Sequence, residues 1–153
     1  MASASFHYEI EHIADDRAAI VLSGVLEGAS LPGLGEEVRR LLCDLLWGSG
    51  VVVDLTAVAQ CDPAACCTLA RIQRRIKARG CRTAWLARRA RLRGVAWWIV
   101  HAAEDPRAMP VTERCSAEQW LLTDERRFDY LGALTHGALQ RAERVLARRR
   151  NRR

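Results

Sequence analysis

The six cysteines are the side chains with the widest range of chemistry in this sequence, and three of them cluster at Cys61, Cys66 and Cys67. No two cysteines form a C-x-x-C pair, and none of the four histidines lies near the cluster, so the spacing of zinc ligands is not met. We therefore expect no metal site, and we interpret the cysteines as small, buried apolar side chains. A reactive thiol at Cys66 or Cys67, near a predicted helix N-terminus, is the alternative interpretation.

Asp54 and Asp62 are the carboxylates that an acid–base mechanism would use. No nucleophile with a neighbouring base accompanies them, and the sequence has neither a phosphate-binding glycine loop nor a dinucleotide-binding fingerprint. We interpret Asp54 as the end of a strand and Asp62 as the N-cap of a helix. The sequence thus predicts no enzyme, no catalytic residue and no cofactor.

The elements that position Asp62 are a strand, a helix and a second strand. The β-branched run at 51–55 is typical of a strand buried on both faces, and after a loop Asp62 and Pro63 form a helix-start signal. Gly80 ends the predicted helix, and a strand over 81–86 follows. Such a unit is parallel and right-handed. The apolar face of the helix consists of residues spaced by four, three and four positions: Ala65, Leu69, Ile72 and Ile76.

The other elements follow from alternation and helical periodicity. They are strands over 6–13 and 18–22 joined by a turn, helices over 34–46 and 91–103, a short strand over 109–112, and a helix through Leu122 opened by a capping box of Ser116 and Gln119. A further helix from about 124 to 149 is amphipathic. In the helix over 91–103, Trp97 and Trp98 cannot both face the core. The outer ring either packs under the C-terminal helix or is an exposed anchor for a partner.

The formal net charge of +6 and the pI near 9.4 suggest a nucleic-acid binder, but the charges are unevenly distributed along the chain. Residues 1–62 carry −7, residues 63–103 carry +10, and residues 141–153 carry +6, so residues 1–140 sum to zero. The arginine-rich tail at 141–153 is therefore the nucleic-acid candidate, against the alternative of a solvated helix end. Four arginines on the predicted helix after Asp62 form either a solvated face or a surface for an acidic partner, another copy included: Arg71, Arg74, Arg75 and Arg79.

The longest apolar run, at 94–100, is far shorter than the roughly 20 residues that span a bilayer, so we expect no membrane segment. The N-terminus has neither the basic nor the apolar region of an export signal. We therefore expect a cytoplasmic protein with reduced thiols.

Three sequence strings together resemble the STAS domain, the family of sulfate-transporter and anti-sigma-factor-antagonist modules, over residues 6–122. Leu-Ser-Gly-Val-Leu-Glu at 22–27 is similar to the family's second-strand exit. Val-Val-Val-Asp-Leu-Thr at 51–56 is similar to its central strand. Cys-Asp-Pro-Ala-Ala at 61–65, with the basic helix to Gly80, resembles its Asp-Ser-Ser-Gly helix start.

This resemblance implies an α/β fold in which a mixed sheet packs against about four helices. It gives a STAS-like domain at 1–122, followed by an amphipathic, arginine-rich helical extension at 123–153. It also implies a non-enzymatic regulatory module whose partner is an anti-sigma factor or a related regulatory kinase. Self-association, and nucleic-acid binding through the tail, are the alternatives.

The site implied by the resemblance lies at the start of the helix. In anti-sigma-factor antagonists the second hydroxyl residue after the aspartate accepts phosphate. That position is Ala64 here, so the usual phosphoacceptor is absent, and Thr56 or Thr68 would be the substitute acceptors, against the alternative that both are ordinary capping or packing hydroxyls. We expect the partner to contact the following residues: Asp62, Pro63, Ala64, Ala65, Thr68 and Arg71.

Overall fold

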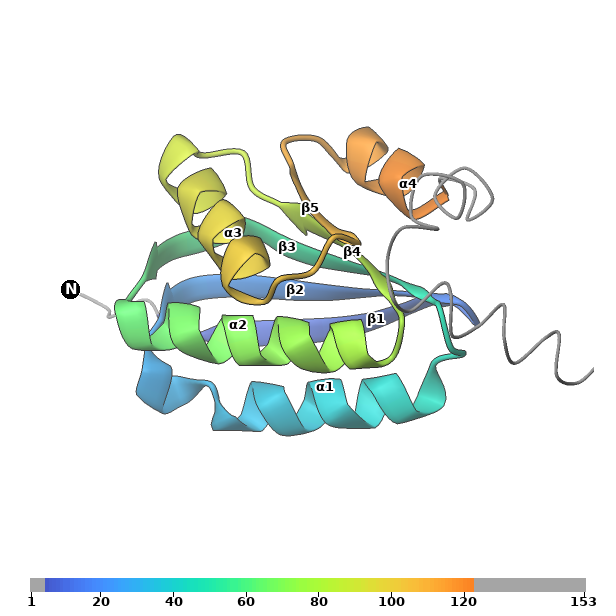
Figure 1. Ribbon diagram of the computed structural model, residues 1–153. Helices are drawn as coiled ribbons and strands as arrows, with labels where there is room; N and C mark the ends of the chain where they lie inside the picture. Colours follow the sequence, from blue (N-terminus) through green and yellow to red (C-terminus); the bar gives the residue numbers. More distant parts are fainter. Residues whose placement is uncertain (1–4, 123–153) are drawn as a thin grey trace, which may run out of the picture. The chain divides into compact units, whose positions relative to one another are not determined.

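The computed structural model describes residues 5–122, which form a five-stranded mixed sheet with helices packed on it (Figure 1). The strand order is β1-β2-β3-β4-β5; β1 and β2 are antiparallel, and the other neighbours are parallel. The elements in chain order are β1 (His7–Ala14), β2 (Arg17–Leu26), the 3₁₀ turn η1 (Gly28–Ser30), α1 (Pro32–Asp44), β3 (Gly50–Cys61), α2 (Pro63–Ala78), β4 (Arg82–Leu86), α3 (Ala90–Ala102), β5 (Ala108–Val111) and α4 (Arg114–Leu122). The expected α/β fold with a mixed sheet and four helices is confirmed.

Alternation along the strands gives the sheet two apolar faces. On β3, Val51, Val53 and Leu55 belong to the large core that α1, α2 and α3 cover, whereas Val52 belongs to a smaller cluster on the other face. The smaller cluster is closed by α4 through Ala117, with Trp120 and Leu121 packed against it. A strand buried on both faces explains the unbroken β-branched run that identified β3 in the sequence. Within residues 5–122, no helix has the length and apolar character needed to cross a membrane.

The structure differs from the predicted boundaries most at β2 and β3, which extend to Leu26 and Cys61, and at the start of α4. β3 continues to Cys61, where a loop was expected, because its second half pairs with β2 as far as Leu26 opposite Cys61. α4 begins at Arg114, so Ser116 lies inside the helix and the predicted capping box is wrong; the Ala117 amide already bonds to the Glu113 carbonyl. The predicted helix over 124–149 lies outside the described residues.

A buried polar network fixes α2 to the sheet. Gln73 is fully buried; its Nε2 donates to Thr83 Oγ1 at 3.0 Å and to Asp105 Oδ2 at 2.7 Å, and its Oε1 accepts from Trp85 Nε1 at 2.8 Å. Asp105 Oδ1 also accepts from the Arg107 amide at 2.9 Å. Because each group would be costly to bury without a partner, the network holds α2, β4 and the α3–β5 connection in one arrangement.

We predict that Gln73→Leu lowers the free energy of unfolding by about 2–4 kcal/mol. The leucine fills a similar volume but leaves three buried polar groups without their hydrogen-bond partner. Urea denaturation measures the change. Gln60 on β3 is exposed, so Gln60→Leu is the matched control and should change stability by less than about 0.5 kcal/mol. Equal stability of the two variants would contradict the role given to the network.

Candidate functional site

Asp62 joins the end of β3, the start of α2 and the loop that follows β2. As the N-cap of α2, its Oδ1 accepts from the Ala65 amide at 2.6 Å, which confirms the capping interpretation. The Gly28 amide donates to Oδ1 and Oδ2 at 3.2 and 3.3 Å, and the Asp62 amide donates to the Leu26 carbonyl at 3.0 Å. One carboxylate therefore satisfies orphan amides of two segments that are far apart in sequence.

Gly28 and Ala64 bring these two segments into direct contact. A Cβ atom at Gly28 would lie 2.5 Å from Ala64 Cβ and 3.1 Å from the Ala64 carbonyl carbon, which is closer than real side chains approach. The position therefore requires glycine for close packing. The sequence did not indicate that Gly28 belongs to the site. It could be recognised only as a glycine that follows the second strand.

The predicted partner-binding residues divide into exposed and buried groups. Pro63 and Ala64 are exposed on the first turn of α2, Asp62 and Thr68 are partly buried, and Arg71 is exposed one turn beyond Thr68. Ala65 is 0% exposed and belongs to the core, so its side chain supports the surface from below.

The two candidate substitute acceptors are both engaged in local hydrogen bonds. Thr68 Oγ1 donates to the Ala64 carbonyl at 3.1 Å and accepts from Arg71 Nη2 at 3.0 Å. Thr56 Oγ1 donates to Asp54 Oδ1 at 2.6 Å, and the Thr56 amide bonds to the same oxygen at 2.8 Å. Asp54 thus lies within β3 and not at the end of a strand as expected, and its carboxylate binds Thr56 where the register of β3 against β2 shifts.

A cavity of about 300 Å³ lies beside this surface, between α1 and α2. Gly28, Thr68 and Arg71 line it together with Arg75 of α2 and Glu36 of α1. Arg75 Nη1 donates to the Gly35 carbonyl at 3.4 Å. The hydrogen bond from Arg39 lowers the pKa of Glu36, and the charges of Arg39, Arg40 and Arg75 act in the same direction, so both signs of charge border the cavity.

Other basic side chains of α2 bind backbone carbonyls of neighbouring segments. Arg74 Nη2 donates to the Ala102 carbonyl at 2.8 Å, Lys77 Nζ to the Glu104 carbonyl at 2.6 Å, and Arg79 Nη2 to the Leu45 carbonyl at 3.2 Å. These carbonyls lie at the C-terminal ends of α3 and α1, where a cation also meets the negative end of the helix dipole. Of the four arginines expected on this face, Arg71 and Arg75 thus lie at the site.

The six cysteines lie in different environments, although we expected all of them to be buried. Burial raises the pKa of the Cys81 thiol, as expected for an apolar core position. The expectation of burial is wrong for three exposed residues: Cys43, Cys67 and Cys115. Cys61 and Cys66 are partly buried, and their Sγ atoms lie 3.5 Å apart. Within residues 5–122, no three histidine, cysteine or acidic side chains gather closely enough to hold a metal ion.

Neither tryptophan of the adjacent pair on α3 is in the core. Trp97 is 56% exposed and Trp98 is 46% exposed. Leu92, Ala96 and Ile99 form the inward face of the helix instead. The C-terminal helix that was expected to cover one ring lies outside the described residues.

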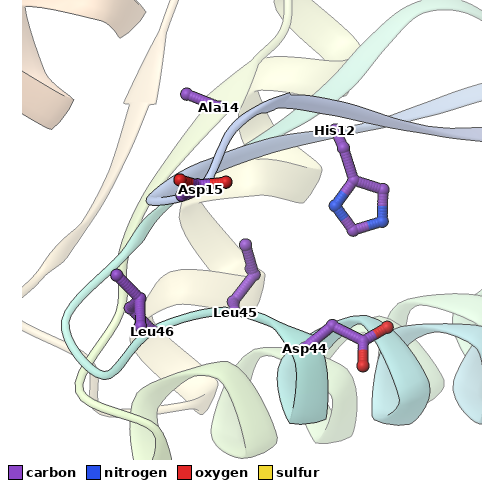
Figure 2. A pocket seen from close by; sticks show the side chains of 6 residues that line it. All are labelled: His12, Ala14, Asp15, Asp44, Leu45 and Leu46. Carbon is purple, nitrogen blue, oxygen red and sulfur yellow. The ribbon is translucent and has the colours of Figure 1, made fainter.

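A second cavity, of about 470 Å³, lies at the opposite end of α1, near the turn between β1 and β2. Figure 2 shows His12, Asp15 and Asp44 spread around it rather than directed at one point. Within the described part of the chain, no hydrogen bond or ion pair links these three side chains. The arrangement is that of a solvated rim, so the surface at Asp62 remains the candidate site.

Comparison with known proteins identifies the fold. No protein-family model matches the sequence, and no curated protein matches it either. Among solved structures, an anti-sigma factor antagonist from Mycobacterium paratuberculosis is 18% identical, with 76% of this chain and 94% of that chain covered and a TM-score of 0.55. The unphosphorylated anti-sigma factor antagonist SpoIIAA is 15% identical, with coverages of 74% and 95% and a TM-score of 0.57.

The phosphorylated Bacillus cell fate determinant SpoIIAA gives the same picture. It is 15% identical, with 74% of this chain and 98% of that chain covered, and its TM-score is 0.56. Residues 5–122 therefore have the STAS-like fold of anti-sigma-factor antagonists, which the three sequence strings predicted.

We predict that Gly28→Ala destabilises the protein by about 1–3 kcal/mol, because the new methyl group overlaps Ala64. Removing the opposing methyl should relieve most of this overlap, so Gly28→Ala combined with Ala64→Gly should cost less than the sum of the single changes. Thermal unfolding of the four proteins in this double-mutant cycle measures the coupling. Additive costs would show that the two residues do not pack against each other.

Proposed function

We propose that the domain is a non-enzymatic regulatory module that binds a protein partner through the Asp62 surface, as anti-sigma-factor antagonists bind theirs. The surface comprises Asp62, Pro63, Ala64, Thr68 and Arg71, with Ala65 beneath it. The observation that carries this proposal is an exposed helix turn, held at the carboxyl end of the central strand by the Asp62 carboxylate, in a fold shared with antagonists.

The chemistry of the surface indicates what a partner must offer. Pro63 and Ala64 present a small, uncharged contact that a closely fitting partner can cover without desolvating a charge. Beside them, Arg71 and Arg75 border the cavity between α1 and α2, where an acidic side chain of the partner would find two guanidinium groups. An anti-sigma factor or a related regulatory kinase is the partner class we propose, with a role in bacterial transcription regulation in the cytoplasm.

Regulation by phosphorylation at Ala64 is chemically excluded, because a methyl group accepts no phosphate. In a regulated antagonist, phosphate at this position would add about two negative charges beside the partner. Because Ala64 cannot be phosphorylated, this modification cannot switch partner binding off. The hydroxyl of Thr68 is bonded to the helix backbone and to Arg71, so we assign it to the structure of the surface.

The nucleic-acid alternative depends on residues 141–153, which lie outside the described part of the chain. Self-association through opposite charges is the other alternative, and it would use the same arginines. Neither gains support from a specific contact among residues 5–122.

We predict that Ala64→Glu weakens partner binding by about tenfold or more, because it places an unpaired negative charge in the centre of the surface. A carboxylate in the first turn suits the helix dipole, so the fold should be retained. The measurement is affinity capture from an extract of the source organism, with mass spectrometry to identify an anti-sigma factor or kinase.

The matched control is Ala78→Glu, which adds the same charge at an exposed position at the other end of α2. It should leave capture at the wild-type level. Capture of a regulator of this class in equal yield by both variants would place the binding surface elsewhere. Recovery of no such regulator by the wild-type protein would overturn the proposed partner class.

A further inference from the structure

The thiols of Cys61 and Cys66 form a close pair at the candidate site. Their Sγ atoms are 3.5 Å apart, within hydrogen-bonding distance for sulfur. Cys61 is the last residue of β3, and Cys66 lies in the first turn of α2. The pair therefore brackets residues 62–65, which include the helix cap and the exposed turn.

Backbone hydrogen bonds hold the two cysteines in this relation. Cys61 pairs with Leu26 in the parallel ladder, and the amide of the next residue, Asp62, bonds to the Leu26 carbonyl. The Cys66 amide donates to the Asp62 carbonyl at 3.0 Å. Because a disulfide has an S–S length of about 2.05 Å, the sulfur atoms need to approach by about 1.5 Å for the bond to form.

The environments of the two thiols give them different roles. Burial raises the pKa of Cys61 to about 12; the neighbouring Cys66 thiol and the Asp62 charge act in the same direction, and the Arg91 charge opposes them. Cys66 lies in the first turn of α2, next to the exposed turn at Pro63 and Ala64. Cys61 is thus the neutral thiol of the pair, which leaves Cys66 as the thiol that reacts first.

We propose that Cys61 and Cys66 are a reversible oxidation site that closes to a disulfide when the protein meets a peroxide. The Cys66 thiolate attacks one peroxide oxygen, the O–O bond breaks, and Cys66 sulfenic acid and hydroxide form. The Cys61 sulfur then attacks the sulfenic sulfur as its proton is lost, and the S–O bond breaks to release water. The two thiols lose two electrons in total, and the peroxide gains them; a dithiol reductant reverses the reaction.

The disulfide would close a six-residue ring around the Asp62 cap and the Ala64 turn. This chemistry stands whether or not the surface binds a partner. Its regulatory meaning rests on the proposed function: oxidation would be a covalent change at the position where a phosphoacceptor is missing. Cys67 is exposed and adjacent, but neighbouring residues on a helix point about 100° apart, so it does not share the Cys61 contact.

The test is oxidation of the full-length reduced protein with one equivalent of hydrogen peroxide, followed by alkylation and peptide mapping. We expect an intramolecular 61–66 disulfide to form about tenfold faster than the exposed thiols Cys43 and Cys115 are oxidised. Cys67→Ser should keep the disulfide, and Cys61→Ser should instead accumulate a sulfenic acid at Cys66 that dimedone traps. Hydrogen exchange of the amides at 64–69 should slow on oxidation and recover on reduction.

A disulfide through Cys67, oxidation of Cys43 and Cys115 as fast as of the pair, or dimers linked between chains as the main product would overturn the proposal. Because Cys61→Ser and Cys66→Ser leave an isosteric side chain, loss of the disulfide in these variants is separable from unfolding, which circular dichroism reports. The partner-capture experiment is carried out with reduced protein, so failure of that binding leaves this test unaffected and the two failures are distinguishable.

Discussion

The Asp62 carboxylate is the interaction on which the arrangement of the candidate site depends. It caps α2 through the Ala65 amide and binds the Gly28 amide, so the helix start and the loop after β2 share one acceptor. A cap is worth about 1 kcal/mol in stability, but its larger effect here is geometric. Because the same carboxylate holds both segments, the turn at Pro63 and Ala64 has a fixed position relative to the loop after β2.

The rest of the fold makes that position rigid. β3 pairs with β2 along nearly its whole length, which carries the chain directly into Asp62 without an intervening loop. At the other end of α2, Gly80 adopts φ +67° to end the helix, as its sequence position predicted. Between these ends, Gln73 anchors the middle of the helix to Thr83, Trp85 and Asp105. The helix is therefore fixed along its length, and the surface at its start moves with the sheet.

Charge has a more structural role in this protein than its pI suggests. Arg74, Lys77 and Arg79 donate to carbonyls at the C-terminal ends of neighbouring helices, whereas Arg71 and Arg75 line the cavity beside the candidate site. The net charge counts all of these cations equally, so it does not show which of them have a structural role. The same holds for the cysteines, which share one composition figure but divide into a buried thiol, three exposed thiols and a contacting pair.

The strand–helix–strand unit around Asp62, the helix end at Gly80 and the lack of a phosphoacceptor at Ala64 could all be predicted from the sequence. Caps, turns and apolar periodicity act between residues close in the chain. The fold was needed to show that Gly28 packs on Ala64, that Gln73 binds Asp105, and that Arg71 and Arg75 line the same cavity. The first two of these contacts join residues more than thirty positions apart. Local patterns do not encode them, since they arise where separate elements meet around a shared core.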